Sequence, residues 1–249
     1  MSNYDFLDIL WEYSMLKHYG IAGLRVAMNT FGRTAVQAEQ YEIPVAGNPD
    51  ILISPVEIPA DSTLTAYQKG DLEYVNTCRQ FYTELLRFNG MMLHSSCVVL
   101  DDRAYLFTAT SGTGKSTHTN LWLQKFGDRA YILNDDKPAL RFEDGTWYAY
   151  GTPWSGKHDI SRNVRVPVAG IAVLERGTEN KITPFTGHEA ISFIMNQIVR
   201  PKEASYRIFL LEIIDRLMQY VPVWKLSCNM NPEAAEVSCR AMQGYGKDA

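Results

Sequence analysis

The segment with the clearest chemistry is a glycine-rich octapeptide, Ala109-Thr-Ser-Gly-Thr-Gly-Lys115-Ser116. It fits the phosphate-binding pattern GxxxxGK[ST], except that alanine replaces the first glycine. Gly112 and Gly114 let the backbone curl so that several amide N–H groups face one point, toward which the following helix also directs its positive end. Lys115 adds a full charge for the outer phosphates, and the Ser116 hydroxyl can join a magnesium shell. The pattern predicts that a nucleoside triphosphate contacts Ser111, Gly112, Thr113, Gly114, Lys115, Ser116 and Thr117.

An acidic pair follows the next apolar run. Asn134-Asp135-Asp136 comes directly after Tyr131-Ile132-Leu133. Two adjacent carboxylates repel each other, and a divalent cation makes their convergence tolerable. An ordinary acidic turn between two strands is the alternative. Beside a phosphate loop, the pattern favours a magnesium-binding carboxylate at the end of a strand.

Two further segments carry groups suited to phosphate chemistry. His94 is expected on the strand that opens the hairpin leading into the phosphate loop, although a single histidine there is more often a packed or surface residue. The segment from Gly151 to His158 contains Lys157, which could close on the phosphates from the opposite side; a solvated surface loop is the alternative. Trp147 and Trp154 are expected to be packing residues rather than base-stacking ones.

The elements that must position these groups are clearest from residue 91 onward. Two β-rich runs, 92–100 and 104–109, flank Asp101-Asp102-Arg103 and predict a hairpin that enters the phosphate loop. A helix is expected over about 115–126 and a strand over 131–133. A second hairpin is expected around Glu143-Asp144-Gly145, followed by a buried strand over 168–175.

Capping signals place the remaining helices. Thr186 with Glu189 three residues later predicts a capping box that opens a helix toward Val199. Asn231-Pro232 predicts a helix start with proline at its first position. Between them, the patterns predict a helix over 203–219 and a final strand over 221–226.

The first 90 residues are less regular. Helical spacing predicts an amphipathic helix over 4–18 and another over 71–88, which Asn89-Gly90 would end. Small strands and loops are expected between residues 20 and 70, with Ile51 to Ile53 as one β-prone run. Strands and helices interleave from 91 onward, so we expect two parts: an N-terminal α+β region, 1–90, and a nucleotide-binding domain, 91–249.

Composition restricts the class of protein. The chain has 249 residues, 46% of them hydrophobic and 21% charged, which is typical of a globular protein with a sizeable core. A formal net charge of −4 gives no electrostatic reason to expect nucleic-acid binding. The four cysteines form no CxxC pair, so reduced thiols are expected rather than a zinc site or a disulfide framework. The sequence contains no uninterrupted run of 18 apolar residues, the length that a membrane-spanning helix needs. We therefore expect a cytoplasmic protein.

Taken together, these features resemble the HPr kinase/phosphorylase and phosphoenolpyruvate carboxykinase superfamily. The order of motifs is a histidine in LHSS, a β-hairpin, the phosphate loop TSGTGKS and the pair NDD, over about 91–240. The resemblance looks closest to short HPr-kinase-like serine kinases of peptide-modification pathways. It implies an α/β (α+β) P-loop domain with a mixed sheet, preceded by the smaller N-terminal region. Ser95 stands where HPr kinases commonly carry glycine, and residues 1–90 do not match the HPr kinase N-terminal domain.

The resemblance also implies roles and ligands. Lys115 would bind the β- and γ-phosphates of ATP, and Ser116 with Asp135 would bind Mg²⁺. Asp136 would be the base for the substrate hydroxyl, with His94 beside it; the order of roles within the aspartate pair stays open. The implied activity is an ATP-dependent kinase acting on a hydroxyl, most plausibly serine of a protein or peptide.

Three other functions remain as alternatives: a small-molecule hydroxyl kinase, a phosphoenolpyruvate carboxykinase-like enzyme, and a non-catalytic nucleotide-binding regulator. Carboxykinases share the core but are about twice as long, which disfavours them. We expect no nucleic-acid or membrane partner, and a homo-oligomer is left open.

Overall fold

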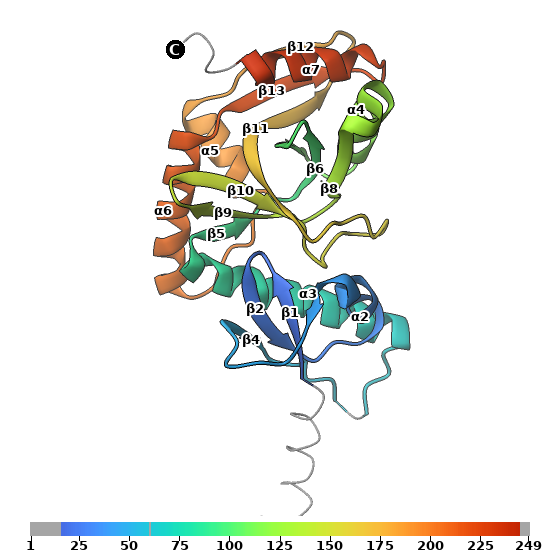
Figure 1. The fold of residues 1–249 in the computed structure, drawn as a ribbon, viewed down its shortest axis with the longest axis vertical. Helices are drawn as coiled ribbons and strands as arrows, with labels where there is room; N and C mark the ends of the chain where they lie inside the picture. Colours follow the sequence, from blue (N-terminus) through green and yellow to red (C-terminus); the bar gives the residue numbers. More distant parts are fainter. Residues whose placement is uncertain (1–15, 60, 245–249) are drawn as a thin grey trace, which may run out of the picture.

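The computed structural model describes residues 16–59 and 61–244, which form two sheets covered by helices (Figure 1). The helix predicted over 4–18 lies almost wholly outside these ranges, and its last two residues belong to strand β1 (Lys17–Ile21) instead. The class is mixed α/β, as the sequence predicted. Elements of the smaller, N-terminal sheet and its helices are β1, β2 (Leu24–Met28), α2 (Gly32–Ala38), β3 (Glu42–Ile43), β4 (Ile51–Ile53) and α3 (Ala66–Leu85).

The N-terminal sheet has the order β3-β1-β2-β4 and packs against one face of α3. Helix α3 begins earlier than the predicted residue 71, because Thr65 caps it: the Thr65 hydroxyl accepts from the Gln68 backbone, and the Gln68 side chain accepts from the Thr65 backbone. A short 3₁₀ helix, η2 (Leu86–Phe88), continues it to Asn89, whose φ of 53° ends the helix at the predicted place. Helix α2 has no counterpart among the sequence predictions.

The larger sheet is mixed and is built around one long strand. Strand β11 (Arg165–Arg176) pairs antiparallel with β10 (Thr146–Tyr150) through its first residues, and then parallel with β7 (Arg103–Thr108) and β13 (Val223–Cys228). Within the described ranges, the order is β5-β9-β10-β11-β7-β6-β8; β13 also pairs with β11, and β12 pairs with β13. The remaining strands are β5 (Gly90–Met92), β6 (Ser95–Leu100), β8 (Ala130–Asn134), β9 (Ala139–Glu143) and β12 (Lys181–Pro184).

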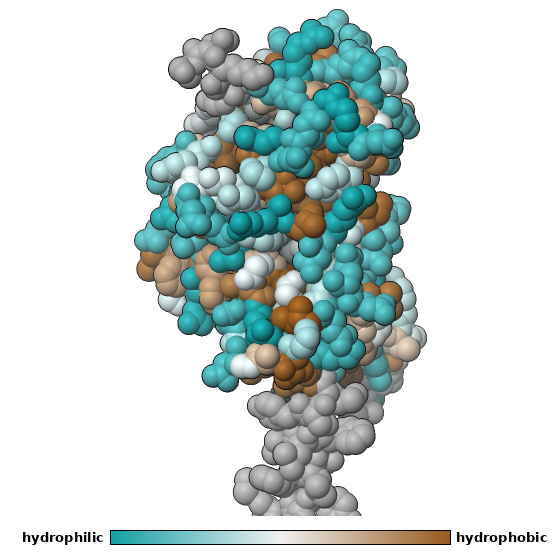
Figure 2. Space-filling view, viewed as in Figure 1, coloured by the Kyte–Doolittle hydropathy of each residue, from teal (hydrophilic) through white to brown (hydrophobic). Residues whose placement is uncertain are grey.

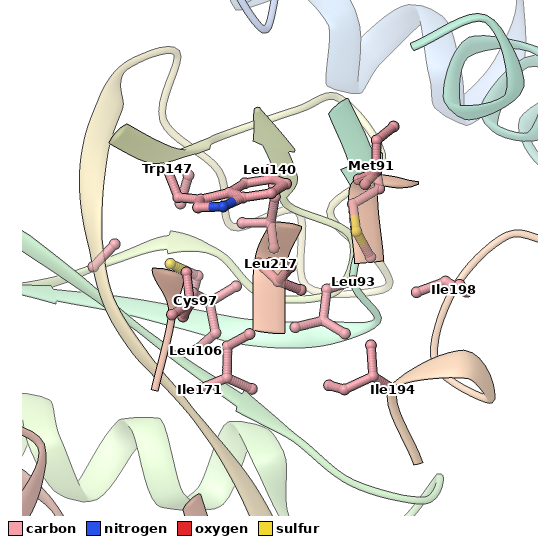
Figure 3. Close-up of a cluster of buried hydrophobic side chains, with 14 of the residues drawn as sticks. Met91, Leu93, Cys97, Leu106, Leu140, Trp147, Ile171, Ile194, Ile198 and Leu217 are labelled. Atoms are coloured by element: carbon pink, nitrogen blue, oxygen red, sulfur yellow. The ribbon is translucent and has the colours of Figure 1, made fainter. Parts of the chain in front are cut away.

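Helices cover both faces of this sheet, which explains the continuous apolar run in β6. Cys97 and Val99 point into a core closed by α5 (Gly187–Met195) and α6 (Ala204–Tyr220), part of which is drawn in Figure 3. Val98 and Leu100 point to the opposite face, under α4 (Lys115–Phe126) and α7 (Glu233–Gly244). Successive strand residues face opposite sides, so a strand covered on both sides must be apolar at every position.

Two sequence predictions are corrected. The run 92–100 is not one strand: β5 ends at Met92 and β6 begins at Ser95, so His94 lies in the break rather than on a strand. The His94 backbone N–H donates to Gln197 O at 2.7 Å and its carbonyl accepts from the Thr108 hydroxyl at 2.8 Å, which takes both groups out of the strand ladder.

The second correction concerns helix α5. It ends at Met195 rather than near Val199, and the Thr186 hydroxyl makes no capping hydrogen bond. Gly187, the first helical residue, has a φ of +72°, which turns the backbone away from the geometry that a capping box needs. Both predicted hairpins, the strand at 131–133 and helix α6 are confirmed.

The surface matches the composition. Seen from the side of Figure 1, hydrophilic residues dominate and hydrophobic ones form small separate clusters (Figure 2). Across residues 16–59 and 61–244, no helix combines the length and apolar character that a membrane crossing needs. All four cysteines are free, and three of them are buried.

We predict that Gly151→Ala strongly destabilises the protein. A Cβ at Gly151 would lie 1.9 Å from the Arg162 carbonyl oxygen, which is backbone and cannot swing aside. Overpacking of this kind costs about 1–3 kcal/mol, measurable as a lower midpoint in urea unfolding. Gly244→Ala, with nothing within 4 Å of the added Cβ, is the control. Equal midpoints for the two variants would contradict the close packing of this loop.

Candidate functional site

Strand directions bring the chemically active segments to one edge of the larger sheet. Strand β6 pairs antiparallel with both β7 and β8, so β7 and β8 run in the same direction. Their carboxyl ends therefore lie at one edge, and the residue that precedes β6 lies there too. The phosphate loop follows β7, Asp135 and Asp136 follow β8, and His94 precedes β6.

The phosphate loop joins β7 directly to α4, as the motif predicted. Gly112 and Gly114 have φ values of +76° and +124°, a region that favours glycine. The loop is braced by a 2.8 Å contact between the hydroxyls of Thr110 and Thr113. Lys115 is half-buried beside it, and burial lowers the pKa of its ammonium group against the opposing effect of Asp136 and Asp135. The loop therefore joins glycine curvature, a helix N-terminus and a cation at one place.

Asp135 is buried and faces two serine hydroxyls. Its Oδ1 accepts from Ser96 Oγ at 2.7 Å, and its Oδ2 accepts from Ser116 Oγ at 3.1 Å. The second contact links the acidic pair to the first turn of α4. A carboxylate and a hydroxyl at this spacing are the kind of oxygen donors that Mg²⁺ takes from a protein when phosphates and water supply the rest. The donor set thus fits Mg²⁺, although the described residues contain no cluster of three or more His, Cys, Asp or Glu side chains placed to hold a metal.

Asp136 is contacted by two basic side chains. His94 Nε2 lies 3.2 Å from Asp136 Oδ1, and the Lys137 ammonium donates to Oδ2. Burial alone would raise the pKa of Asp136, but the hydrogen bond from His94 and the charge of Lys137 outweigh it and lower the pKa to about 2. Asp136 is therefore an anion at neutral pH.

Sequence reasoning missed two residues that shape this carboxylate. The buried Asn134 side chain accepts from the backbone N–H groups of Asp136 and Lys137 at 3.1 and 2.8 Å, and donates to the Thr152 carbonyl at 2.9 Å. Lys137 was missed because a lysine after an acidic pair has no motif of its own. Asn134 could have been suspected, since asparagine commonly bonds its own backbone two residues on.

The segment 151–160 is not a simple surface loop, although Lys157 and His158 at its tip are exposed. It packs against α3 through Trp154, whose ring stacks on Phe81 with centroids 4.8 Å apart. Trp154 is fully buried and Trp147 nearly so, which confirms both as packing residues. Figure 1 shows the long connection between β10 and β11 descending toward α2 and α3.

Gly156 brings this segment against Asp136. A Cβ there would lie 2.9 Å from Asp136 Cβ, and the φ of +75° also favours glycine. The Gly156 backbone N–H donates to the Tyr74 hydroxyl at 3.1 Å, and its carbonyl accepts from Gln37 Nε2 at 2.9 Å. Helices α2 and α3 thus hold the wall that faces the acidic pair.

Two cavities flank the phosphate loop. One, of about 510 Å³, is lined by Gly112, Gly114, Thr117 and His118 together with residues at the ends of β11 and β13. The other cavity, of about 560 Å³, is lined by most of the groups predicted for chemistry and by residues of α2 and α3. Its lining residues are Arg33, Tyr67, Asp71, Tyr74, Val75, His94, Ser111, Lys115, Ser116, Asp135, Asp136, Lys137, Ser155, Gly156, Lys157 and His158. The structure therefore divides the predicted residues between two sides of the loop.

One buried acid lies at the contact between α2 and α3. Glu73 of α3 is buried and accepts from the Thr34 hydroxyl of α2. Burial raises the pKa of Glu73 to about 7, despite the opposing hydrogen bonds from Thr34 and the Phe31 backbone. The neighbouring Arg33 of α2 reaches the larger cavity, so this contact also positions a cavity residue.

We predict that Glu73 makes the folded state lose stability as pH rises from about 4.5 to about 7. Between these pH values the unfolded chain is ionised while the folded chain retains the proton. The difference between a pKa of about 4.5 in the unfolded chain and about 7 in the folded chain corresponds to about 3 kcal/mol. Glu73→Gln should flatten the dependence of the unfolding free energy on pH and be more stable at pH 8, whereas the exposed Glu233→Gln should match the parent. A parallel pH dependence in all three proteins would refute this.

The chain matches one family of known proteins. No curated protein matches the chain. Among solved structures, the HPr(Ser) kinase/phosphatase from Coxiella burnetii is similar over 61% of this chain and 96% of that chain, with 12% identity and a TM-score of 0.36. Residues 68–237, more than half of the chain, match the model of a family described as SynChlorMet cassette protein ScmC. That range contains the phosphate loop, the aspartate pair and most of α3, and the chain belongs to the ScmC family.

Proposed function

We propose that this protein is an ATP-dependent kinase that transfers the γ-phosphate to a hydroxyl group, with serine of a protein or peptide as the acceptor. The supporting observation is the meeting of Lys115, Ser116, Asp135, Asp136 and His94 at one edge of the sheet, beside two cavities. Phosphoryl transfer needs positioning, charge neutralisation and a group that orients the acceptor. This set provides a candidate for each need.

The nucleoside would occupy the cavity of about 510 Å³. Leu121 and Leu174 give it apolar walls, and burial lowers the pKa of His118 to about 4, so the imidazole is uncharged at neutral pH. Arg176 donates to the Gly112 carbonyl at 2.8 Å and fixes that side of the loop. A flat, uncharged base fits such a site better than the ionic cavity on the other side of the loop.

The phosphates would then cross the loop toward the acidic pair. Lys115 would bind the β- and γ-phosphates, aided by Lys157 from the opposite wall. Ser116 and Asp135 would hold Mg²⁺, which neutralises phosphate charge when bound. Opening the 3.1 Å contact between Ser116 Oγ and Asp135 Oδ2 would free both oxygens for this role.

Asp136 would orient the acceptor hydroxyl. The hydroxyl oxygen forms a bond to the γ-phosphorus, the bond from that phosphorus to the β–γ bridging oxygen breaks, and ADP leaves. A carboxylate with a pKa of about 2 is a weak base, so Asp136 would take the proton only as the new P–O bond forms. His94 and Lys137 hold its two oxygens, and an entering hydroxyl would displace the Lys137 ammonium from Oδ2.

We predict that Lys115→Ala keeps the fold and weakens Mg-ATP binding. The substitution removes a charge-assisted contact to the outer phosphates and leaves the loop backbone unchanged. The expected loss is about 2 kcal/mol, or about 30-fold in Kd, measurable by titration calorimetry. Lys181→Ala, an exposed lysine on β12, is the matched control. Parental affinity in a folded Lys115→Ala protein would sink the nucleotide-site assignment.

The two aspartates should separate by role. Asp136→Asn should bind Mg-ATP nearly as the parent does and lose single-turnover transfer by about 10²-fold or more, because it loses the anion that orients the hydroxyl and takes its proton. Asp135→Asn should instead raise the Mg²⁺ concentration needed for half-maximal activity. The exposed Asp128→Asn controls for loss of charge. Transfer at the parental rate by Asp136→Asn would disprove its role, and failure to bind Mg-ATP would exchange the two assignments.

A further inference from the structure

The cavity that contains Asp136 has a wall that no part of the phosphate chemistry uses. Helix α3 contributes Tyr67, Asp71 and Val75 to it, and α2 contributes Arg33. Since the acceptor hydroxyl must reach Asp136 from this cavity, the molecule that carries the hydroxyl enters a space that α3 helps to line. The α3 residues in this wall therefore bear on what the acceptor is.

The spacing of Tyr67, Asp71 and Val75 places them in one row along α3, which we call the α3 ridge. Tyr67, Asp71 and Val75 follow one another at intervals of four, so they lie along the same side of the helix. The ridge is about 12 Å long at a rise of about 1.5 Å per residue. An extended peptide of about four residues covers the same length at about 3.3 Å per residue.

The exposure of the α3 side chains favours a peptide over a small metabolite as the acceptor. Tyr67 is 75% exposed and Val75 is 61% exposed, although both line the cavity. A site built for a small molecule encloses most of its ligand and buries its apolar lining. Two large side chains left open at the rim are instead suited to a chain that crosses the cavity and continues beyond it.

An ion pair that offers both hydrogen-bond donors and hydrogen-bond acceptors lies between Tyr67 and Val75. Arg33 and Asp71 approach to 3.3 Å and are each about one-third exposed or more. The guanidinium lies over the Tyr74 ring, 3.7 Å from its centroid, which fixes its orientation. A peptide group presents one donor and one acceptor, and this pair offers the complementary acceptor and donor.

We propose that the α3 ridge and Arg33 form the acceptor-binding surface, and that the acceptor is an extended polypeptide segment bearing a serine. This inference rests on the proposed kinase function and specifies how residues of the N-terminal part serve it. Tyr67 and Val75 pack against side chains on either side of the serine, and the Arg33–Asp71 pair binds the peptide backbone between them.

The test uses the full chain, Mg-ATP labelled at the γ-phosphate, and peptides with one serine flanked by randomised residues. The parent should label the peptides. Tyr67→Ser and Val75→Ser should each lower the rate at subsaturating peptide about tenfold, through a higher KM for the peptide rather than a lower kcat. Leu211→Ser, on α6 and 60% exposed, is the matched control and should equal the parent.

The outcomes distinguish this inference from the proposed function. Tyr67→Ser and Val75→Ser rates equal to that of Leu211→Ser would overturn the α3 surface while leaving a peptide kinase. A parent that binds Mg-ATP but labels no peptide would overturn the polypeptide acceptor and leave the nucleotide site standing. A parent that does not bind Mg-ATP would overturn the proposed function, and this inference with it.

Discussion

Strand β6 lies between β7 and β8 and pairs antiparallel with both, so that these two strands end at the same edge of the sheet. This pairing places the phosphate loop next to the aspartate pair, and it places His94, at the entry to β6, beside both. The strands are held in this order by apolar residues on both faces of β6. The placement of these chemical groups therefore depends on the packing of β6 in the core.

Each charged side chain at that edge of the sheet has its own polar or charged partners. Asp135 accepts hydrogen bonds from two serine hydroxyls, Asp136 is paired with His94 and Lys137, and Lys115 is half-buried beside the loop. Lys137 also lies over the Tyr74 ring, at 5.3 Å from its centroid. Because Tyr74 belongs to α3, the N-terminal part contributes directly to the electrostatic environment of Asp136.

Local patterns predicted the elements whose cause is local. The octapeptide at 109–116 predicted a loop between a strand and a helix, and the turn residues at 101–103 and 143–145 predicted both hairpins. The break at His94 could not be predicted, because it arises from hydrogen bonds to Gln197 and Thr108, far away in sequence. Thr186 shows the reverse case, in which a local capping signal is overridden by the positive φ of Gly187.

For the site too, local patterns predicted only part of the residues, because long-range packing brings the others to it. Most groups predicted from motifs lie together at one edge, and Lys157 was predicted on the opposite side, but the α2 and α3 residues of that opposite wall were not predicted. Arg33, Tyr67 and Asp71 belong to no motif. They line the cavity together with the 151–160 segment, which Trp154 and Gly156 hold against α3. Long-range packing of this kind leaves no signal in spacing or composition.

The central claim is that this edge binds Mg-ATP and passes its γ-phosphate to a polypeptide hydroxyl. The most direct measurement is to incubate the protein with γ-labelled ATP, Mg²⁺ and cell extract, and then to separate macromolecules from metabolites and identify the labelled residue. We expect label on serine of a polypeptide, and none when Lys115→Ala replaces the parent. Label confined to a metabolite or to inorganic phosphate, or nucleotide binding with no transfer at all, would contradict it.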